Sequence, residues 1–242
     1  MALDGVLSVA LAPACAACDR VLDEPTAGPV CQACWAGVRP VVHPLCAACG
    51  DPLASWRVLS AAEGRCPRCR RRPPAFDAAR AAGEYDGDLR AILHAFKYDG
   101  RRSLARPLAA LMRDRAGDLL RDVDLVIPVP LHRWRRLRRG FNQADELAHR
   151  LGLPVRRVLR RSRATRPQAG LQPAGRRRNV RGAFELAWFA RPSDVCDRCV
   201  VLVDDVRTTG ATLDACALVL KAAGAREVRA LTAARAAPRR PS

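Results

Sequence analysis

The chain has 242 residues, which is enough for one large domain or two smaller ones. Apolar residues make up 49% of it and charged residues 27%, a mixture that excludes intrinsic disorder and predicts a packed core. The formal net charge of +18 predicts positive surface regions that attract phosphates, nucleic acid or another anionic partner.

Neither a membrane span nor a secretory signal is predicted. No apolar run approaches the roughly 18 to 20 residues of a membrane span. The opening segment 1–13 lacks the basic region that precedes the apolar part of a signal peptide. We therefore expect a soluble, cytoplasmic protein, in which the eleven cysteines are candidate metal ligands rather than disulfides.

Four C-x2-C pairs lie near the start of the chain, in a region with little apolar periodicity. They are Cys15 and Cys18, Cys31 and Cys34, Cys46 and Cys49, and Cys66 and Cys69. The two-residue spacer lets both thiolates of a pair face one ion, and zinc takes four such ligands. We predict two structural zinc sites in a small module at 1–74, with consecutive pairs combined. Spacing alone leaves an interleaved combination, the first pair with the third, open.

The remaining residues, 75–242, alternate between helical and strand-like patterns. Apolar residues recur at helical spacing over 89–96 and 104–112, an apolar run covers 125–129, and a helix is expected at about 142–151. A second apolar run at 200–203 is followed by a helical segment at 210–223 and a short strand near 228–232. Strands that alternate with helices predict an α/β fold with a mostly parallel sheet.

The second apolar run ends in Asp204 and Asp205, and a turn rich in hydroxyl groups then opens the next helix. Ligands of open parallel sheets bind at this position, outside the carboxyl end of a strand. The backbone N–H groups of such a turn face an anion, and Gly210 permits close approach. The segment therefore predicts a phosphate site. Because adjacent residues of an extended chain point to opposite sides, we expect the two carboxylates to have different partners.

Two further features remain. Cys196 and Cys199 repeat the two-residue spacing but stand apart from the other pairs, and we interpret them, like Cys216, as structural. The segment from Arg133 to Arg181 holds sixteen arginines against two acidic residues, which suits either a diphosphate or a nucleic acid backbone.

Aromatic residues in and beside this segment lead to two expectations. Trp134 and Phe141 are candidates for stacking on bases. Phe184, Trp188 and Phe189 are expected to pack in the core.

The segment 201–212 resembles the ribose-5-phosphate binding motif of type I phosphoribosyltransferases. The whole chain resembles the ComF family of competence-associated, phosphoribosyltransferase-like proteins. The matching motifs, besides the cysteine pairs, are HAFKYDG at 94–100, PVPLH at 128–132, RGFNQ at 139–143, TRPQAGL at 165–171 and RNVRGAF at 178–184. Arg207 departs from the pattern, because this position is usually aliphatic in type I enzymes, and no serine-glycine-glycine diphosphate loop is present.

The resemblance implies a double zinc ribbon followed by a type I phosphoribosyltransferase-like domain. It also implies binding of 5-phosphoribosyl-1-diphosphate with magnesium, and transfer of the ribosyl phosphate to a nitrogenous acceptor. Asp204 and Asp205 would be catalytic. The residues implied to bind the 5-phosphate are Thr208, Thr209, Gly210, Ala211 and Thr212. Those implied to neutralise the diphosphate are Lys97, Arg136, Arg139, Thr165, Gln168 and Arg178.

Two alternatives stay open at this stage. The chain is a competence protein that binds single-stranded DNA during DNA uptake, with the phosphate site as a sensor or relic, or it is a purely structural zinc adaptor. The sequence names neither the acceptor base nor the oligomeric state.

Overall fold

A computed structural model of the chain describes residues 13–53, 64–132, 137, 139–163, 175, 180 and 182–237. The strands are β1 (Ala78–Glu84), β2 (Leu125–Pro128), β3 (Leu159–Arg161), β4 (Phe184–Leu186), β5 (Cys199–Arg207) and β6 (Glu227–Arg235). The helices are α2 (Gln32–Ala36), α3 (Pro67–Arg71), α4 (Gly87–Tyr98), α5 (Ala105–Ala116), α7 (Gln143–Ala148) and α9 (Ala211–Ala222). Short 3-10 turns cover Pro25–Ala27, Arg102–Leu104, Gly117–Leu120 and Pro192–Asp194.

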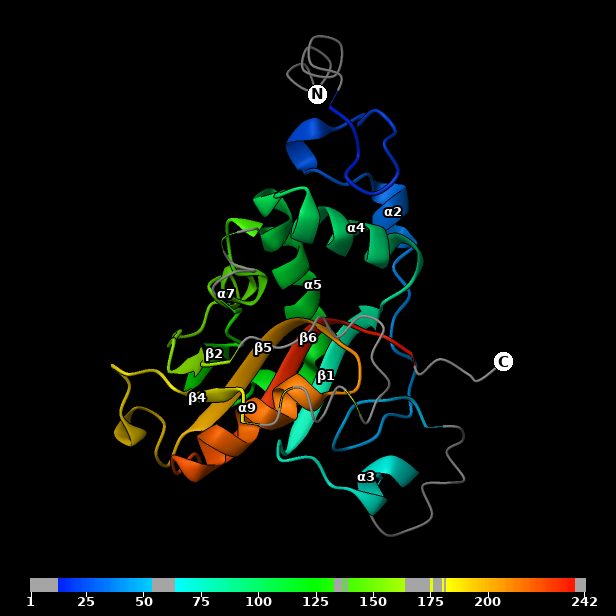
Figure 1. Cartoon of the computed structure of the whole chain (residues 1–242). Helices are drawn as coiled ribbons and strands as arrows, with labels where there is room; N and C mark the ends of the chain where they lie inside the picture. Colours follow the sequence, from blue (N-terminus) through cyan, green and yellow to red (C-terminus); the bar gives the residue numbers. More distant parts are fainter. Residues whose placement is uncertain are drawn as a thin grey trace.

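The central sheet has four strands in the order β1-β6-β5-β2, and each neighbouring pair is parallel (Figure 1). Helices cover both faces of the sheet. Consecutive residues of β5 alternate between the two cores: Val201 and Val203 pack with α4, α5 and α7, whereas Val200 and Leu202 pack with α9. A strand buried on both faces reads as a continuous apolar run, which explains the sequence of β5. The predicted parallel α/β fold is confirmed.

The predicted helices and strands are present with shifted ends. The apolar positions Leu89, Ile92, Leu93 and Phe96 form the buried face of α4, as their spacing predicts. Helix α7 is shorter than expected. Strands β5 and β6 extend beyond the apolar runs that predict them, because hydrogen bonding to neighbouring strands continues past the apolar residues.

Three strands of the structure have no counterpart in the sequence prediction. β1 consists mostly of alanine with one glycine, residues that have little strand preference, and it forms by pairing with β6. β3 and β4 form a separate antiparallel pair that brackets the segment 162–183.

The two cysteine-rich ribbons pack against different cores of the same sheet. Cys15 and Cys34 lie in the core that contains α4, and the four cysteines of the second ribbon lie in the core that contains α9. The chain between the ribbons runs along the edge strand β1, where the Glu84 N–H donates to the carbonyl oxygen of Arg39 at 2.9 Å. The ribbons thereby cover an edge that would otherwise expose unpaired backbone groups. A domain boundary after residue 74 stays a prediction.

None of the described helices has both the length and the apolar character that crossing a bilayer requires.

Candidate functional site

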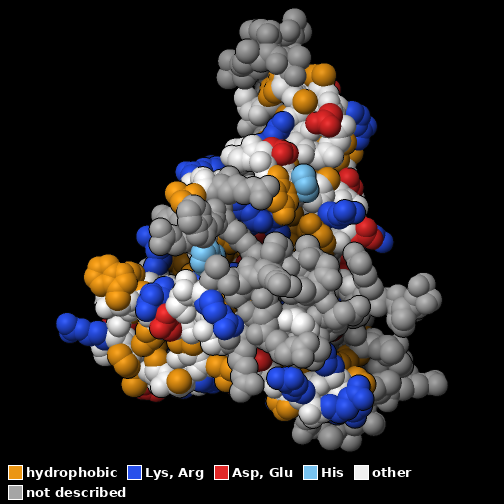
Figure 2. Space-filling model, in the orientation of Figure 1, with side chains coloured by type: hydrophobic (Ala, Val, Ile, Leu, Met, Phe, Trp, Pro, Cys, Tyr) orange, Lys and Arg blue, Asp and Glu red, His pale blue; other side chains and the backbone are white. Residues whose placement is uncertain are grey.

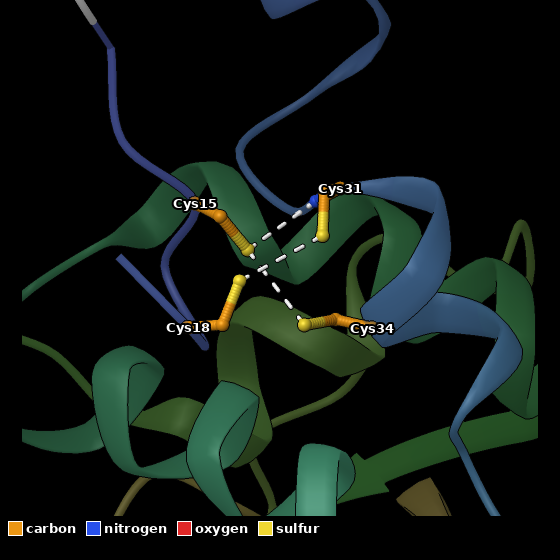
Figure 3. A group of neighbouring side chains, drawn as sticks. All are labelled: Cys15, Cys18, Cys31 and Cys34. Atoms are coloured by element: carbon orange, nitrogen blue, oxygen red, sulfur yellow. Dashed lines mark hydrogen bonds between the residues drawn. The ribbon is translucent and has the colours of Figure 1, made fainter. Parts of the chain in front are cut away.

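The first four cysteines form one cluster, in which all sulfur atoms lie within 4.8 Å of one another and point inward (Figure 3). The sulfurs of Cys15 and Cys34 are 4.0 Å apart, and those of Cys18 and Cys31 are 3.8 Å apart. Four thiolates at about 2.3 Å from a zinc ion lie about 3.8 Å from one another, the edge of a tetrahedron. The cluster therefore fits zinc.

The second cluster repeats this arrangement with Cys46, Cys49, Cys66 and Cys69, again within 4.8 Å. Consecutive pairs are combined in both clusters, as predicted, and the interleaved alternative is wrong. In each ribbon the later pair begins at the N-cap of a short helix: Cys31 caps α2 and Cys66 caps α3. Residues three apart share one face of a helix, so each helix directs two thiols to one point.

The surroundings favour the thiolate, the form that binds zinc, at some cysteines of each cluster, whereas burial raises the pKa of Cys34 and the hydrogen bond with Cys49 raises the pKa of Cys69. The Arg20 Nε–H donates to the Cys18 sulfur at 3.4 Å and lowers the pKa of Cys18 to about 6. A hydrogen bond with the Cys69 thiol lowers the pKa of Cys49 to about 5. Backbone N–H groups of Cys31 and Cys66 donate to the sulfurs of Cys15 and Cys46 at 3.3 and 3.2 Å.

The remaining pair, Cys196 and Cys199, lies elsewhere. Cys196 is exposed, whereas Cys199 is buried in β5 and its thiol donates to a Glu227 carboxylate oxygen at 3.5 Å. Among the described residues, neither belongs to a group of three or more candidate metal ligands. Nothing in this arrangement departs from a structural interpretation.

The turn between β5 and α9 has the conformation that the sequence predicts. Gly210 is the N-cap of α9 and adopts a left-handed conformation, with φ +78°, which glycine accepts without strain. The Ala211 N–H points back to the Thr209 hydroxyl at 3.4 Å. A small pocket opens at this point. Its lining residues are Asp204, Val206, Arg207, Thr208, Gly210, Ala211, Thr212 and Leu213.

The two aspartates before the turn face different partners. The Asp205 carboxylate is 3.1 Å from the Lys97 ammonium of α4, and both side chains are largely buried. The Asp204 carboxylate accepts a hydrogen bond from the Asp205 N–H at 2.8 Å. On the opposite side of the sheet, burial and then the Asp204 charge raise the pKa of Cys216 in α9. The two carboxylates therefore have different partners, as the alternation of an extended chain predicts.

Burial, followed by the charge of Asp205, raises the pKa of Asp204 to about 7, while Lys97 and Arg161 act in the opposite direction. Asp204 is therefore poised to exchange a proton near neutral pH, when a cation or a hydroxyl donor approaches it.

The predicted diphosphate-binding residues are only partly described. Arg139 lies near α4, with its guanidinium 5.1 Å from the Tyr98 ring centroid, next to Lys97 in the chain. Its Nη1 also donates to the Gln143 side chain at 3.1 Å. The other predicted members, Arg136, Thr165, Gln168 and Arg178, lie outside the described residues.

Two charged residues near the pocket were missed in the sequence. The charge of Arg161, in β3, lowers the pKa of Asp204. Nothing in the arginine-rich segment distinguishes Arg161 from the other arginines. Asp51 of the second ribbon binds Arg207, the last residue of β5, at 2.7 Å. No local pattern predicts this contact between residues so far apart in the chain.

Three expectations for aromatic residues meet different outcomes. Phe184 is buried as expected, but Trp188 and Phe189 are 86% and 60% exposed, so their placement in the core was wrong. The error follows from their position in the loop after β4, where none of the described helices covers them. Phe141 is buried and packs against Phe96 in a tilted arrangement, with ring centroids 5.4 Å apart, so it is not available for stacking on bases. Trp134 lies outside the described residues.

Comparison with known proteins places this geometry in a family. The model of the double zinc ribbon domain matches residues 6–70, and that of the phosphoribosyl transferase domain matches residues 136–241. Competence protein F of Haemophilus influenzae is 32% identical over 217 residues, which cover 86% of this chain and 90% of the relative. The chain belongs to the ComF family.

A second relative, the DNA utilization protein YhgH of Salmonella typhimurium, is 33% identical over 83% of this chain and 87% of its own length. Among solved structures, the allosteric regulatory enzyme of purine biosynthesis has a TM-score of 0.37 and 23% identity, over 58% of this chain and 30% of that one. This ComF protein thus combines a double zinc ribbon with a phosphoribosyltransferase-like domain that contains β3 to β6, the turn at 208–210 and α9.

Proposed function

We propose that this ComF protein binds 5-phosphoribosyl-1-diphosphate and transfers its ribosyl phosphate to a nitrogenous acceptor. The observation that supports this function best is the order of groups at the end of β5. Asp204 and Asp205 lie directly before the left-handed turn at Gly210, and Lys97 lies beside Asp205. These groups match the three parts of the ligand, namely ribose hydroxyls, 5-phosphate and diphosphate.

Each residue has a defined task in this proposal. The backbone N–H groups and hydroxyls of residues 208–212 bind the 5-phosphate at the N-terminus of α9. Asp204 and Asp205 accept hydrogen bonds from the ribose hydroxyls and so orient the ring. Lys97 and Arg139 supply positive charge to the diphosphate as it departs. Catalysis then consists mainly of positioning and charge stabilisation.

Magnesium fits the same site, because two adjacent carboxylates are the hard oxygen ligands that it prefers. When bound with the ligand, it supplies positive charge to the diphosphate. Asp204 and Asp205 are the residues that would hold it or its water ligands.

Calorimetry and an assay of diphosphate release test the function. We expect phosphoribosyl diphosphate with magnesium to bind more tightly than ribose 5-phosphate or nucleoside monophosphates. Diphosphate release should then depend on an added purine, pyrimidine or amine acceptor. Equal affinity for all phosphate esters, together with no release over a panel of acceptors, would contradict the enzyme assignment.

Single-stranded DNA binding is a second candidate, and the exposed pair Trp188 and Phe189 favours it. Their rings lie 5.3 Å apart in an edge-to-face arrangement, on the segment after β4. Figure 2 shows an apolar group at the left edge of one face, on the side where Figure 1 draws this segment, with basic side chains nearby. Exposed aromatic rings beside positive charge are typical of surfaces on which bases stack.

The arginine-rich segment gives this candidate less support than its charge suggests. Several of its described arginines already have acidic partners within the fold. Arg150 pairs with Glu146 at 2.7 Å, Arg157 with Asp145 at 2.6 Å, and Arg160 with Glu185 at 2.9 Å.

A further inference from the structure

A buried ion pair joins the second zinc ribbon to the phosphate turn. Arg207 ends β5 and is followed directly by Thr208. Its side chain is 1% exposed, and its Nη2 donates to Asp51 Oδ1 at 2.7 Å. Asp51 follows the zinc ligand Cys49 by two residues. The last residue before the turn is therefore held by a residue of the zinc ribbon.

Asp51 is fixed from both halves of its ribbon. Arg68, which lies between Cys66 and Cys69, donates to Asp51 Oδ2 at 2.9 Å. Gly50 adopts φ +66°, and a Cβ at this position would lie 2.3 Å from the carbonyl oxygen of Ala79. The backbone beside Asp51 is thus in close contact with β1.

A second residue of the sheet also binds the Asp51 carboxylate. Arg235, at the end of β6, donates to Asp51 Oδ1 at 3.0 Å and to Glu84 at 2.9 Å. A buried carboxylate shared by three guanidinium groups has little freedom to move.

Arg207 touches the turn that it precedes. It lines the pocket together with residues 208 and 210–213. A Cβ on Gly210 would lie 4.0 Å from Arg207 Cδ, which is van der Waals distance. The Arg207 Nε is buried and has no hydrogen-bond partner in the described part of the chain. The guanidinium therefore depends on Asp51 for its position, and a buried arginine without such a partner would be strongly unfavourable.

The first ribbon lacks this connection although its knuckle has the same spacing. Cys15-Ala-Ala-Cys18 is followed by Asp19 and Arg20, whereas Cys46-Ala-Ala-Cys49 is followed by Gly50 and Asp51. Asp19 has φ +58° at the position of Gly50. Arg20 stands at the position of Asp51, is exposed, and bonds to the Cys18 sulfur.

We propose that Asp51 is a positioning residue for the phosphate turn and acts through Arg207. Zinc at the second site, by ordering the ribbon around Asp51, then stabilises the turn, whereas zinc at the first site does not. The effect of Asp51 on ligand affinity rests on the proposed function.

Hydrogen exchange without any ligand tests the positioning itself. In Asp51→Asn, amides of residues 204–213 should exchange faster than in the wild type, because a local opening becomes easier. Asp19→Asn makes the same chemical change beside the first ribbon's knuckle and should leave these amides unchanged, and strand β2 serves as an internal reference. If Asp51→Asn does not fold, Asp51→Glu keeps the charge among three arginines but displaces it by one methylene. Wild-type exchange in the variant that folds would overturn the proposal.

A second measurement asks whether Asp51 acts through Arg207. We expect Asp51→Asn to weaken ribose 5-phosphate by about ten-fold in the wild-type background and by less than about two-fold in Arg207→Leu. Equal weakening in both backgrounds would overturn the route through Arg207. If the wild type binds no phosphate ester but Asp51→Asn still accelerates exchange in the turn, the proposed function fails and the positioning role stands.

Discussion

Lys97 Nζ lies 3.1 Å from Asp205 Oδ1, although the two residues are separated by more than a hundred positions in the sequence. The end of α4 and the end of β5 meet here, at the carboxyl edge of the sheet. The Lys97 ammonium also lies 5.7 Å from the Tyr85 ring centroid. A lysine at a helix end is usually a solvated charge, but this one is largely buried and faces the candidate site.

Lys97→Met should weaken the binding of phosphoribosyl diphosphate more than that of ribose 5-phosphate, because the ammonium neutralises the diphosphate and not the 5-phosphate. We expect a loss of about 1.5–3 kcal/mol for the former, typical of a charged hydrogen bond. Lys221→Met removes the only other lysine and the same charge, far from the turn, and serves as the control. Calorimetry with both ligands measures the difference, and parallel losses in the two lysine variants would contradict a local role for Lys97.

Asp205→Asn and Gly210→Val should weaken different parts of the ligand. The asparagine removes a charge that holds hydroxyls or magnesium. The binding free energy of phosphoribosyl diphosphate should therefore fall by roughly 1.5–3 kcal/mol, and that of inorganic phosphate should change little. Valine at φ +78° strains the turn, so every 5-phosphate ligand should weaken alike. Titration of both variants, with circular dichroism to verify folding, measures this. Unchanged affinity in both would reduce the segment to a strand, a turn and a helix cap.

The affinity for phosphoribosyl diphosphate with magnesium should rise by about ten-fold between pH 6 and pH 8. Burial raises the pKa of Asp204 to about 7, so its carboxyl group is mostly protonated at pH 6 and mostly charged at pH 8. Only the charged form attracts a cation or accepts two hydroxyl donors. The ligand's own 5-phosphate also ionises near pH 6. In Asp204→Asn, only the pH dependence that comes from the ligand's 5-phosphate should remain. If the affinity of this variant changed with pH as much as that of the wild type, Asp204 would not titrate in binding.

The same pKa shift predicts how the free energy of unfolding changes with pH. The folded state holds the Asp204 proton more tightly than the unfolded state, so this contribution is present at pH 4 and is lost as pH rises to about 7. Chemical denaturation of the wild type and of Asp204→Asn over this range measures it. A difference between the two proteins that does not change with pH would contradict the shift.

Purified protein should contain two zinc ions per chain, and Cys31→Ser and Cys66→Ser should each lose one of them. Each substitution removes a ligand from a different tetrad. Because both tetrads share cores with the sheet, chelation should lower the melting temperature of the whole chain. Metal analysis and thermal unfolding measure these outcomes. Loss of both ions from either variant would contradict two separate sites.

Replacing Trp188 and Phe189 with serine should weaken single-stranded DNA by about 1–3 kcal/mol per stacked base, if the second candidate function holds. The salt dependence of binding should stay the same, because phosphate contacts are untouched. Fluorescence anisotropy with a short oligonucleotide at several salt concentrations measures both quantities. Trp35→Ser, in the first ribbon, provides an aromatic control away from this surface. An unchanged affinity would remove this surface from DNA binding.

Features that depend on local spacing can be predicted from the amino-acid sequence. Each C-x2-C pair presents two thiols to one point within a single knuckle or helix turn, so two tetrads follow from four pairs. The segment from Val200 to Thr212 encodes a buried strand, two carboxylates and a glycine turn that opens a helix, because alternation and glycine conformation act over a few residues. The ordering of strands and helices likewise predicted a parallel sheet.

Features that depend on partners distant in the chain become visible only in the folded protein. β1 forms because β6 offers an edge to pair with, and its alanines carry no strand signal of their own. Lys97 reaches Asp205, and Asp51 reaches Arg207, because the sheet brings α4, β5 and the second ribbon to one edge. Trp188 and Phe189 are exposed because, within the described ranges, no helix covers the loop after β4. The arrangement of whole helices and strands determines which distant side chains come into contact. Local spacing in the sequence does not predict these contacts.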